Sequence, residues 1–313
     1  MTEKTRIQIE EMKKQTIGVE IEMAEITRGN ACKVIAKYFG TTSTVNHYGG
    51  SYDAWKCQDN QGRTWTVMRD VSISASSDAR KAELVTPILT YADIPDLQNI
   101  VRELRHKGAV SNPDHGCGVH IHIGANGHTP KTLRNLANIM ASHEELITKA
   151  INISSWRIRN YCRTVDQNFL QRLNRRKPTT MSELADIWYA DNYGNRSAHY
   201  NRTRYHMLNL HATFTKGTIE FRLFQFDNPS NGRKGGLHAG QLKSYIQLCL
   251  AMSQMAKQVR SASPRPMQIE NPCFAMRTWL MRIGFIGEEF KTARDLFTKR
   301  LEGDPAFRFG RSA

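Results

Sequence analysis

The chain has 313 residues, of which 40% are hydrophobic, and a formal net charge of +15 at pH 7. This length allows a large core in one elaborated domain or two small ones, which excludes a small disulfide scaffold. No apolar stretch is long enough to span a bilayer, and residues 1–6 do not lead into the apolar core of a signal peptide. We therefore expect a cytoplasmic protein.

Six cysteines lie far apart with no CxxC motif, at Cys32, Cys57, Cys117, Cys162, Cys249 and Cys273. This spacing indicates neither a zinc ribbon nor a disulfide framework. We expect reduced, buried thiols.

The first half of the chain alternates between strand and helix patterns. The expected strands are 15–25, a hairpin of 52–58 with 63–69, 83–85 and 118–123. The expected helices are 30–39, ended by Gly40, 93–107, followed by Gly108, and 129–151, opened by Thr129-Pro130.

The second half begins with a basic and polar stretch, 154–200, in which we expect short helices and loops. A second hairpin is predicted from 205–214 and 218–224, and then helices at 237–259, 273–283 and 286–302. The turn-rich segment 261–266 separates a predicted catalytic domain, residues 1–260, from a linker and helical extension, residues 261–313.

Three of the expected strands carry two ionisable residues at positions i and i+2. These pairs are Glu20 with Glu22, His120 with His122, and Glu220 with Arg222. Because side chains alternate along a strand, each pair stands on one face, about 6.6 Å apart. Such pairs are costly to bury unless they hold a metal, a phosphate or an opposite charge. The pattern predicts one shared polar site.

The apolar residues of the same strands occupy the opposite face. They are Val19, Ile21, Val119, Ile121, Ile123, Ile219, Phe221 and Leu223. We therefore predict an α+β fold: a mainly antiparallel sheet with helices packed on one face and a polar metal and nucleotide basin on the other.

Four motifs occur in a characteristic order. They are the GVEIE strand at 18–22, Asp70-x-Ser72 with Glu83-Leu-Val-Thr-Pro, the CGVHIHIG strand at 117–124 and the TIEFR strand at 218–222. In this order they resemble the amidoligase family, which belongs with glutamine synthetase and γ-glutamylcysteine ligase, the carboxylate–amine ligases. The resemblance covers about residues 16–250 and implies a glutamine synthetase-like catalytic sheet.

The resemblance implies an ATP-dependent ligase that activates a carboxylate as an acyl phosphate and joins it to an amine. An amino acid such as glutamate would be joined to an amine or a peptide. Two or three Mg²⁺ ions, with Mn²⁺ as a substitute, would be held by Glu20, Glu22, Glu83, Glu220 and one of His120 and His122. Oxygen ligands suit Mg²⁺, and an imidazole can fill one place.

The same motifs imply roles for the remaining polar residues. Arg222 would stabilise the γ-phosphate and act in catalysis with Glu220 and Glu83. Arg204 and Asn209 would hold the nucleotide phosphate or a substrate carboxylate. Val71 stands where the family pattern has glycine, which leaves the metal role of Asp70 open.

Glycine-rich residues between 232 and 236 could contact phosphate or form a flexible helix entry. They are Gly232, Arg233, Lys234, Gly235 and Gly236.

The sequence leaves alternatives. A zinc-dependent hydrolase would use the same residue types, but it does not explain Arg222 or the number of glutamates. A cupin-type oxygenase requires a carboxylate soon after His-x-His, and none occurs between His122 and Glu144. The identity of both substrates and the oligomeric state stay open.

A basic run offers a separate function. It consists of Lys149, Arg157, Arg159, Arg163, Arg172, Arg175, Arg176 and Lys177, opposed by Asp166 alone. The run could bind nucleic acid or an acidic protein, or it could form a solvated helix surface. Aromatic residues do not interleave it as a base-stacking platform requires.

Overall fold

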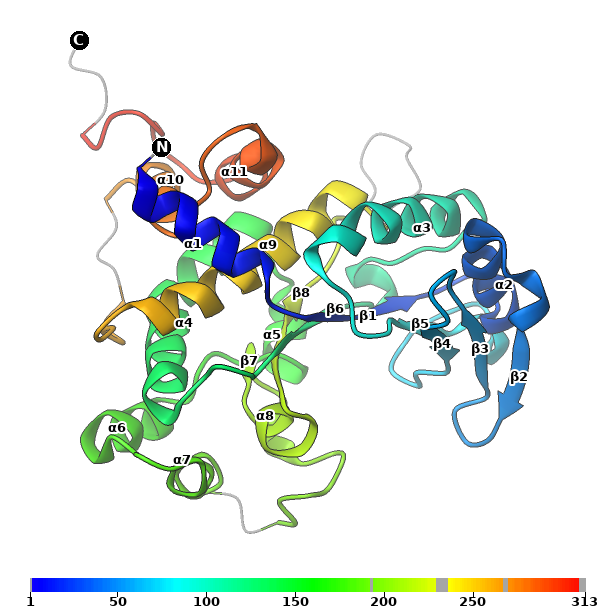
Figure 1. The fold of residues 1–313 in the computed structure, drawn as a ribbon, viewed down its shortest axis with the longest axis horizontal. Coiled ribbons are helices and arrows are strands. Elements are labelled where there is room, and N and C mark those ends of the chain that lie inside the picture. Colours follow the sequence, from blue (N-terminus) through cyan, green and yellow to red (C-terminus); the bar gives the residue numbers. More distant parts are fainter. Residues whose placement is uncertain (1, 192–193, 229–235, 267–269, 310–313) are drawn as a thin grey trace. The chain divides into compact units, whose positions relative to one another are not determined.

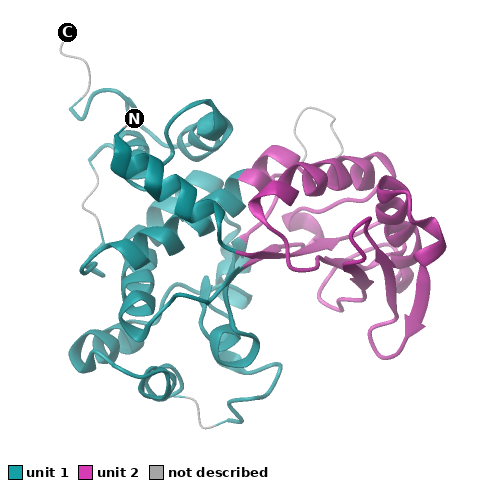
Figure 2. Ribbon diagram, viewed as in Figure 1, with its two compact units in different colours: residues 1–15, 123–223, 244–313 teal, residues 16–122, 224–243 magenta. Residues whose placement is uncertain are grey.

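The computed structural model describes residues 2–191, 194–228, 236–266 and 270–309. The chain divides into two compact units, shown in different colours in Figure 2. Unit 1 comprises residues 1–15, 123–223 and 244–313, and unit 2 comprises residues 16–122 and 224–243.

Unit 2 is built around a sheet (Figure 1). The strand order is β2-β3-β4-β5-β1-β6. The strands are β1 Ile17–Met23, β2 Asn46–Gly49, β3 Ala54–Gln58, β4 Thr64–Met68, β5 Ala82–Val85 and β6 Val119–Gly124. The last two residues of β6 belong to unit 1. The pairs β1–β5, β2–β3, β3–β4 and β4–β5 are antiparallel, as the sequence predicts.

Two helices cover the apolar side of this sheet. Helix α2, Arg28–Phe39, packs on β3, β4 and β5, and α3, Ile94–His106, packs on α2. The Thr27 hydroxyl caps α2 by accepting from the Asn30 N–H, and Gly40 ends it in the left-handed conformation at φ 72°. The apolar residues of β1 and β6 predicted to face helices are fully buried, Val19, Ile21, Val119 and Ile121 among them.

Unit 1 is mainly helical. Its helices are α1 Glu3–Lys13, α4 Pro130–Ile151, α5 Ser155–Asn160, α6 Gln167–Arg176, α7 Met181–Trp188, α8 His211–Lys216, α9 Ala239–Gln258, α10 Pro272–Arg282 and α11 Lys291–Thr298; the first turn of α9 belongs to unit 2. Helix α4 packs on α6 and α11, and α10 packs on α11. Strand β7, Leu208–Asn209, pairs antiparallel with β8, Thr218–Phe224, so that Asn209 lies opposite Glu220.

Most predicted elements are confirmed. They include helices α2, α3, α4, α9 and α10 and the β3–β4 hairpin, with bounds within a few residues of those expected. The structure is therefore a mixed α/β fold with antiparallel pairing. All six cysteines are buried free thiols. Within the described ranges no helix has the length and apolar character needed to cross a bilayer.

Two expectations about the secondary structure are wrong, and one helix was not predicted. The predicted strand 205–214 is reduced to β7, because the Asn209 side chain accepts the His211 N–H at 2.9 Å and turns the chain into α8. The last helix begins at Lys291 instead of 286, after Gly287 at φ 90°. The N-terminal helix α1 was not expected. Of the glycine-rich residues that could contact phosphate or form a flexible helix entry, 232–235 lie outside the described residues.

The apolar face of β6 gives a direct test of the core. Ile121 is fully buried, whereas Ile88 is 73% exposed. We expect Ile121→Ala to lower the free energy of unfolding by about 2–5 kcal/mol, through lost transfer energy and the cavity left behind. The matched control Ile88→Ala should change it by less than about 0.5 kcal/mol. Chemical denaturation measures both, and equal effects would contradict this assignment of the core.

Candidate active site

Unit 2 gathers carboxylates and imidazoles from β1, β5, β6 and the loop after β4. We call this set the carboxylate cluster; it consists of Glu20, Glu22, Asp70, Glu83, His120 and His122. Glu22 on β1 lies directly opposite Glu83 on β5 in the antiparallel register, which puts both side chains on one face. Strand β6 is the neighbour of β1 and carries both histidines.

The cluster contains two groups of atoms arranged as metal ligands. In one, an oxygen or nitrogen from each of Glu20, Glu83 and His120 lies within 4.8 Å of the others. In the second, carboxylate oxygens of Glu22, Asp70 and Glu83 lie equally close together. Glu83 belongs to both groups, so two cation positions can lie side by side and share one carboxylate.

The imidazoles of the cluster lie against the glutamates. His120 Nδ1 lies 3.0 Å from Glu20 Oε2, its Nε2 lies 3.7 Å from Glu22 Oε1, and His122 Nε2 lies 3.3 Å from Glu20 Oε1. Burial raises the pKa of the Glu20 carboxyl, but the imidazoles of His122 and His120 outweigh it and hold that pKa well below its ordinary value. Glu20 is therefore ionised at neutral pH.

Backbone groups fix the carboxylates in place. The Gly118 N–H donates to Glu22 Oε2 at 2.6 Å, and the Ser72 N–H donates to Asp70 Oδ1 at 2.7 Å. The second group has an all-oxygen donor set, which suits a hard cation such as Mg²⁺. The first group adds one imidazole, which Mg²⁺ and Mn²⁺ both accept. The residues present thus fit divalent cations.

Unit 1 holds the third predicted pair, on β8. Arg222 Nη1 donates to Glu220 Oε1 at 2.5 Å, and Asn209 Nδ2 donates to Glu220 Oε2 at 2.6 Å. The side chains of Arg222 and Glu220 are only 5% and 3% exposed. The ring of Tyr205 lies 5.7 Å from the Arg222 guanidinium. This environment holds the guanidinium in one orientation.

The backbone carbonyl of Arg222 is hydrogen-bonded by a member of the basic run. Arg157, which is buried, donates from Nη2 to the Arg222 carbonyl at 3.0 Å, and the Arg222 N–H donates to the Met207 carbonyl. Arg157 is therefore a structural residue rather than part of a solvated face.

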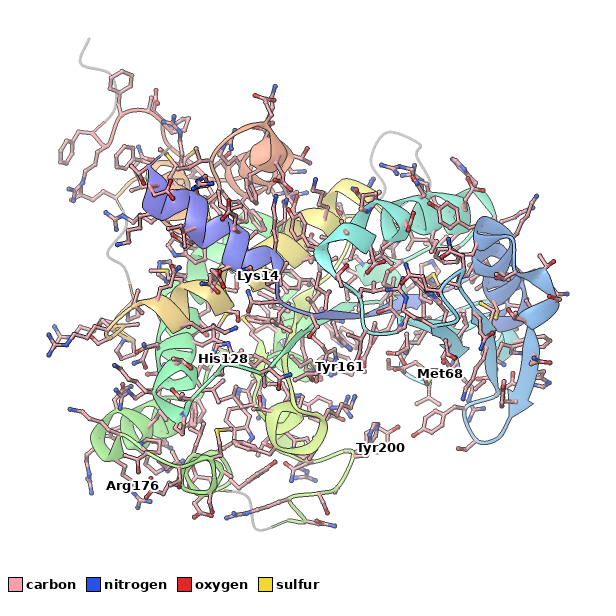
Figure 3. The ribbon with its side chains drawn as sticks, viewed as in Figure 1. Lys14, Met68, His128, Tyr161, Arg176 and Tyr200 are labelled. Carbon is pink, nitrogen blue, oxygen red and sulfur yellow. The ribbon has the colours of Figure 1, made fainter. Side chains whose placement is uncertain are left out.

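A cavity of about 210 Å³ in unit 1 is lined by Asn209 and Glu220 together with Arg204 and Lys216. Arg204 lies in a short 3₁₀ helix, Arg202–Arg204, just before the strand expected at 205–214. Its guanidinium donates to the His199 carbonyl at 3.0 Å and lies over the ring of Tyr200, an exposed residue labelled in Figure 3. Arg204 and Asn209 are thus brought to one cavity, although by different local structure.

Sequence reasoning missed three of these neighbours. Asp70 was left open because Val71 departs from the family pattern, yet its carboxylate joins the cluster. Tyr205 could have been found, because alternation places it on the same face as Asn209. Lys216 lies between the two strands predicted at 205–214 and 218–224, and in the structure it ends α8 and lines the cavity.

Residues 13–253 match the family described as "Putative amidoligase enzyme". This range includes every residue of the carboxylate cluster and of the β8 pair. Among solved structures, a bifunctional glutathione synthetase from Pasteurella multocida is similar with a TM-score of 0.41 and 11% sequence identity. The match covers 96% of this chain and 49% of that chain, so the chain spans about half of its length. No curated protein matches the sequence.

The two ligand groups predict stabilisation by a divalent cation. A cation that binds only the folded state at about 100 times its Kd adds about 2.7 kcal/mol, and we expect saturating Mg²⁺ to raise the thermal midpoint by about 5 °C. Because Glu83 belongs to both groups, Glu83→Gln should remove most of this rise. Glu103→Gln, at an exposed position on α3 in the same unit, should leave it intact. Scanning calorimetry measures the shift, and a rise that survives Glu83→Gln would contradict the shared site.

Proposed function

The chain belongs to the amidoligase family, and on that premise we propose that it is an ATP-dependent carboxylate–amine ligase. A substrate carboxylate oxygen attacks the γ-phosphorus of ATP, ADP leaves, and an acyl phosphate forms. The amine nitrogen then attacks the acyl carbon, inorganic phosphate leaves, and the nitrogen loses a proton as the amide forms. The observation that carries this proposal is the pair of ligand groups that share Glu83.

We assign the carboxylate cluster to Mg²⁺. When bound, Mg²⁺ neutralises phosphate charge and orients the γ-phosphate for transfer. Glu83 would contribute to two ions, Glu22 and Asp70 to one, and Glu20 with His120 to the other. His122 and Glu220 stay in the proposed set on their family motifs, and Mn²⁺ is the expected substitute. Asp70 is added to the set because of its position beside Glu22 and Glu83.

Arg222 would stabilise the charge that develops on the transferred phosphoryl group. A catalytic cation is most effective when it is oriented in advance, because no reorganisation is then needed during the reaction. Glu220 orients the Arg222 guanidinium in advance, because it accepts one short hydrogen bond from the guanidinium and another from Asn209. On the family motifs, the proposed catalytic residues are Arg222, Glu220 and Glu83, and the proposed type of sheet is glutamine synthetase-like.

Arg204 and Lys216 give the cavity at Asn209 and Glu220 two cationic walls. We propose that this cavity receives an anionic part of the reactants, either phosphate or the carboxylate of an amino acid or peptide. Glutamate is the amino acid that the family resemblance suggests. The arginine fork suits a carboxylate, whereas the lysine acts as a point charge.

Two alternatives from the sequence receive less support. A zinc-dependent hydrolase needs three ligands and a water, whereas this cluster offers more carboxylate oxygens than such a site uses. A nucleic-acid binder needs a continuous basic face, but Arg157 is buried and Arg172 forms an ion pair with Asp191. The family match covers the residues of the proposed ligase site.

Nucleotide turnover tests the ligase. With Mg²⁺, ATP, a mixture of amino acids and an amine donor, the purified protein should release ADP and form an amide in equal amounts. Arg222→Lys keeps the charge but loses the forked geometry, and we expect kcat to fall about 100-fold. Arg159→Lys, an exposed arginine in the same unit, is the control and should leave kcat unchanged.

Coupled ADP detection and mass spectrometry of the product provide the readouts. Release of ADP that is equal in the wild type and in Arg222→Lys would reject the role of Arg222. Absence of any ADP release with every carboxylate tested, while Mg²⁺ still stabilises the protein, would reject the ligase but leave the cation site standing.

A further inference from the structure

A second cavity in unit 1 is lined by residues of the segment 205–209, which also contacts Arg222. Tyr205 and Asn209 contact Arg222 and Glu220, whereas the alternate residues His206 and Leu208 line a cavity of about 320 Å³. We call this the guanidinium cavity; its other lining residues include three arginines, two aromatic residues and two carboxylates, namely Arg163, Arg172, Arg202, Phe169, Trp188, Asp166 and Asp191.

Two of the three arginines of the guanidinium cavity, Arg163 and Arg202, are not neutralised by its carboxylates, Asp166 and Asp191. Arg172 binds Asp191 through both terminal nitrogens, at 3.2 and 2.5 Å, and the Asp166 carboxylate accepts the Phe169 N–H to cap α6. In the part of the chain that the structure describes, Arg163 and Arg202 have no carboxylate within 4.0 Å. The contacts of the Arg163 guanidinium are the carbonyls of Tyr205 and Arg202, at 3.4 and 3.5 Å.

A buried donor in the same wall also lacks an acceptor. Arg172 Nε has no hydrogen-bond partner among the described residues, although the atom is inaccessible to solvent. Leaving a buried N–H unsatisfied is costly, and native structures normally supply an acceptor.

The cavity lining also includes aromatic side chains, which we call the aromatic wall. The Trp188 ring packs edge-to-face against Phe169, with centroids 4.9 Å apart at 85°, and against His206, at 6.2 Å and 71°. Trp188 Nε1 already donates to Thr203 Oγ1 at 3.0 Å, so the polar atom of the indole is satisfied. These aromatic side chains therefore present a flat, apolar surface, and the indole N–H on it is already hydrogen-bonded. Such a surface suits a ring.

We propose that the guanidinium cavity binds an organic phosphate or carboxylate that carries one flat ring. Guanidinium forks match the oxygens of either anion, and the aromatic wall accepts the ring. The volume lies at the lower end of the range for small-molecule sites. This site uses none of the residues assigned to the ligase reaction, and it gives part of the basic run a specific function.

Isothermal titration calorimetry at fixed ionic strength tests the proposal with four probes. Phenyl phosphate and benzoate combine an anion with a ring, inorganic phosphate lacks the ring, and benzyl alcohol lacks the charge. We expect at least one of the first two to bind about tenfold or more tightly than either of the last two. Which of the two binds better identifies the anion as phosphate or carboxylate.

Variants assign the binding to the cavity. Arg163→Gln and Arg202→Gln, both at exposed positions, should each weaken the binding of the better probe about tenfold or more. Arg159→Gln removes the same charge from the same run outside the cavity and should have little effect. Circular dichroism checks that each variant folds.

Three outcomes would overturn the proposal. In the first, no probe binds, or inorganic phosphate binds as tightly as phenyl phosphate. In the second, Arg159→Gln weakens binding as much as Arg163→Gln, which would indicate general attraction of anions. In the third, Arg222→Lys abolishes binding, which would place the probe at the ligase site. Because binding is measured without ATP, failure here leaves the proposed ligase unaffected, and the reverse also holds.

Discussion

The antiparallel register between β1 and β5 is the constraint on which unit 2 depends. It sets Glu22 opposite Glu83, and like charges directly opposite one another destabilise a sheet. A one-residue shift would relieve this repulsion, but it would also turn the buried Val19 and Ile21 away from the helices. Hydrophobic burial therefore holds the carboxylates together, and the repulsion must be offset by the histidines of β6 and, when present, by a divalent cation.

Strand β8 also buries charged groups at a cost in free energy, but here the two charges are opposite. A buried ion pair such as Arg222–Glu220 gains little net stability, because desolvation of both groups opposes their attraction. The pair instead fixes an orientation. Asn209 donates to one Glu220 oxygen, Arg222 donates to the other, and Arg157 donates to the backbone carbonyl of Arg222. Burying these groups costs free energy, but it fixes the Arg222 guanidinium in one direction, which a solvated arginine would not keep.

Strand periodicity explains why so much of the site could be predicted. Alternation alone assigned Glu20, Glu22, His120 and His122 to polar faces, because the period of a strand is fixed by the backbone. Asp70 could not be placed in this way, since a loop residue has no period and its position depends on the turn closed by the Ser72 N–H. The predicted strand 205–214 failed at Asn209 for a related reason: one side-chain hydrogen bond outweighed strand propensity over the residues that follow.

The members of the basic run differ in burial and therefore in role, and this difference cannot be seen in the sequence. Arg157 is buried under β8 and acts on the backbone of Arg222, whereas Arg172 is tied to Asp191. Arg163 binds only carbonyls among its described neighbours and keeps a charge available to an anion. A net charge of +15 therefore predicts attraction to anions in general. The kind of anion is decided by what lies beside each guanidinium, and for the cavity at Trp188 that is an aromatic wall rather than a second row of cations.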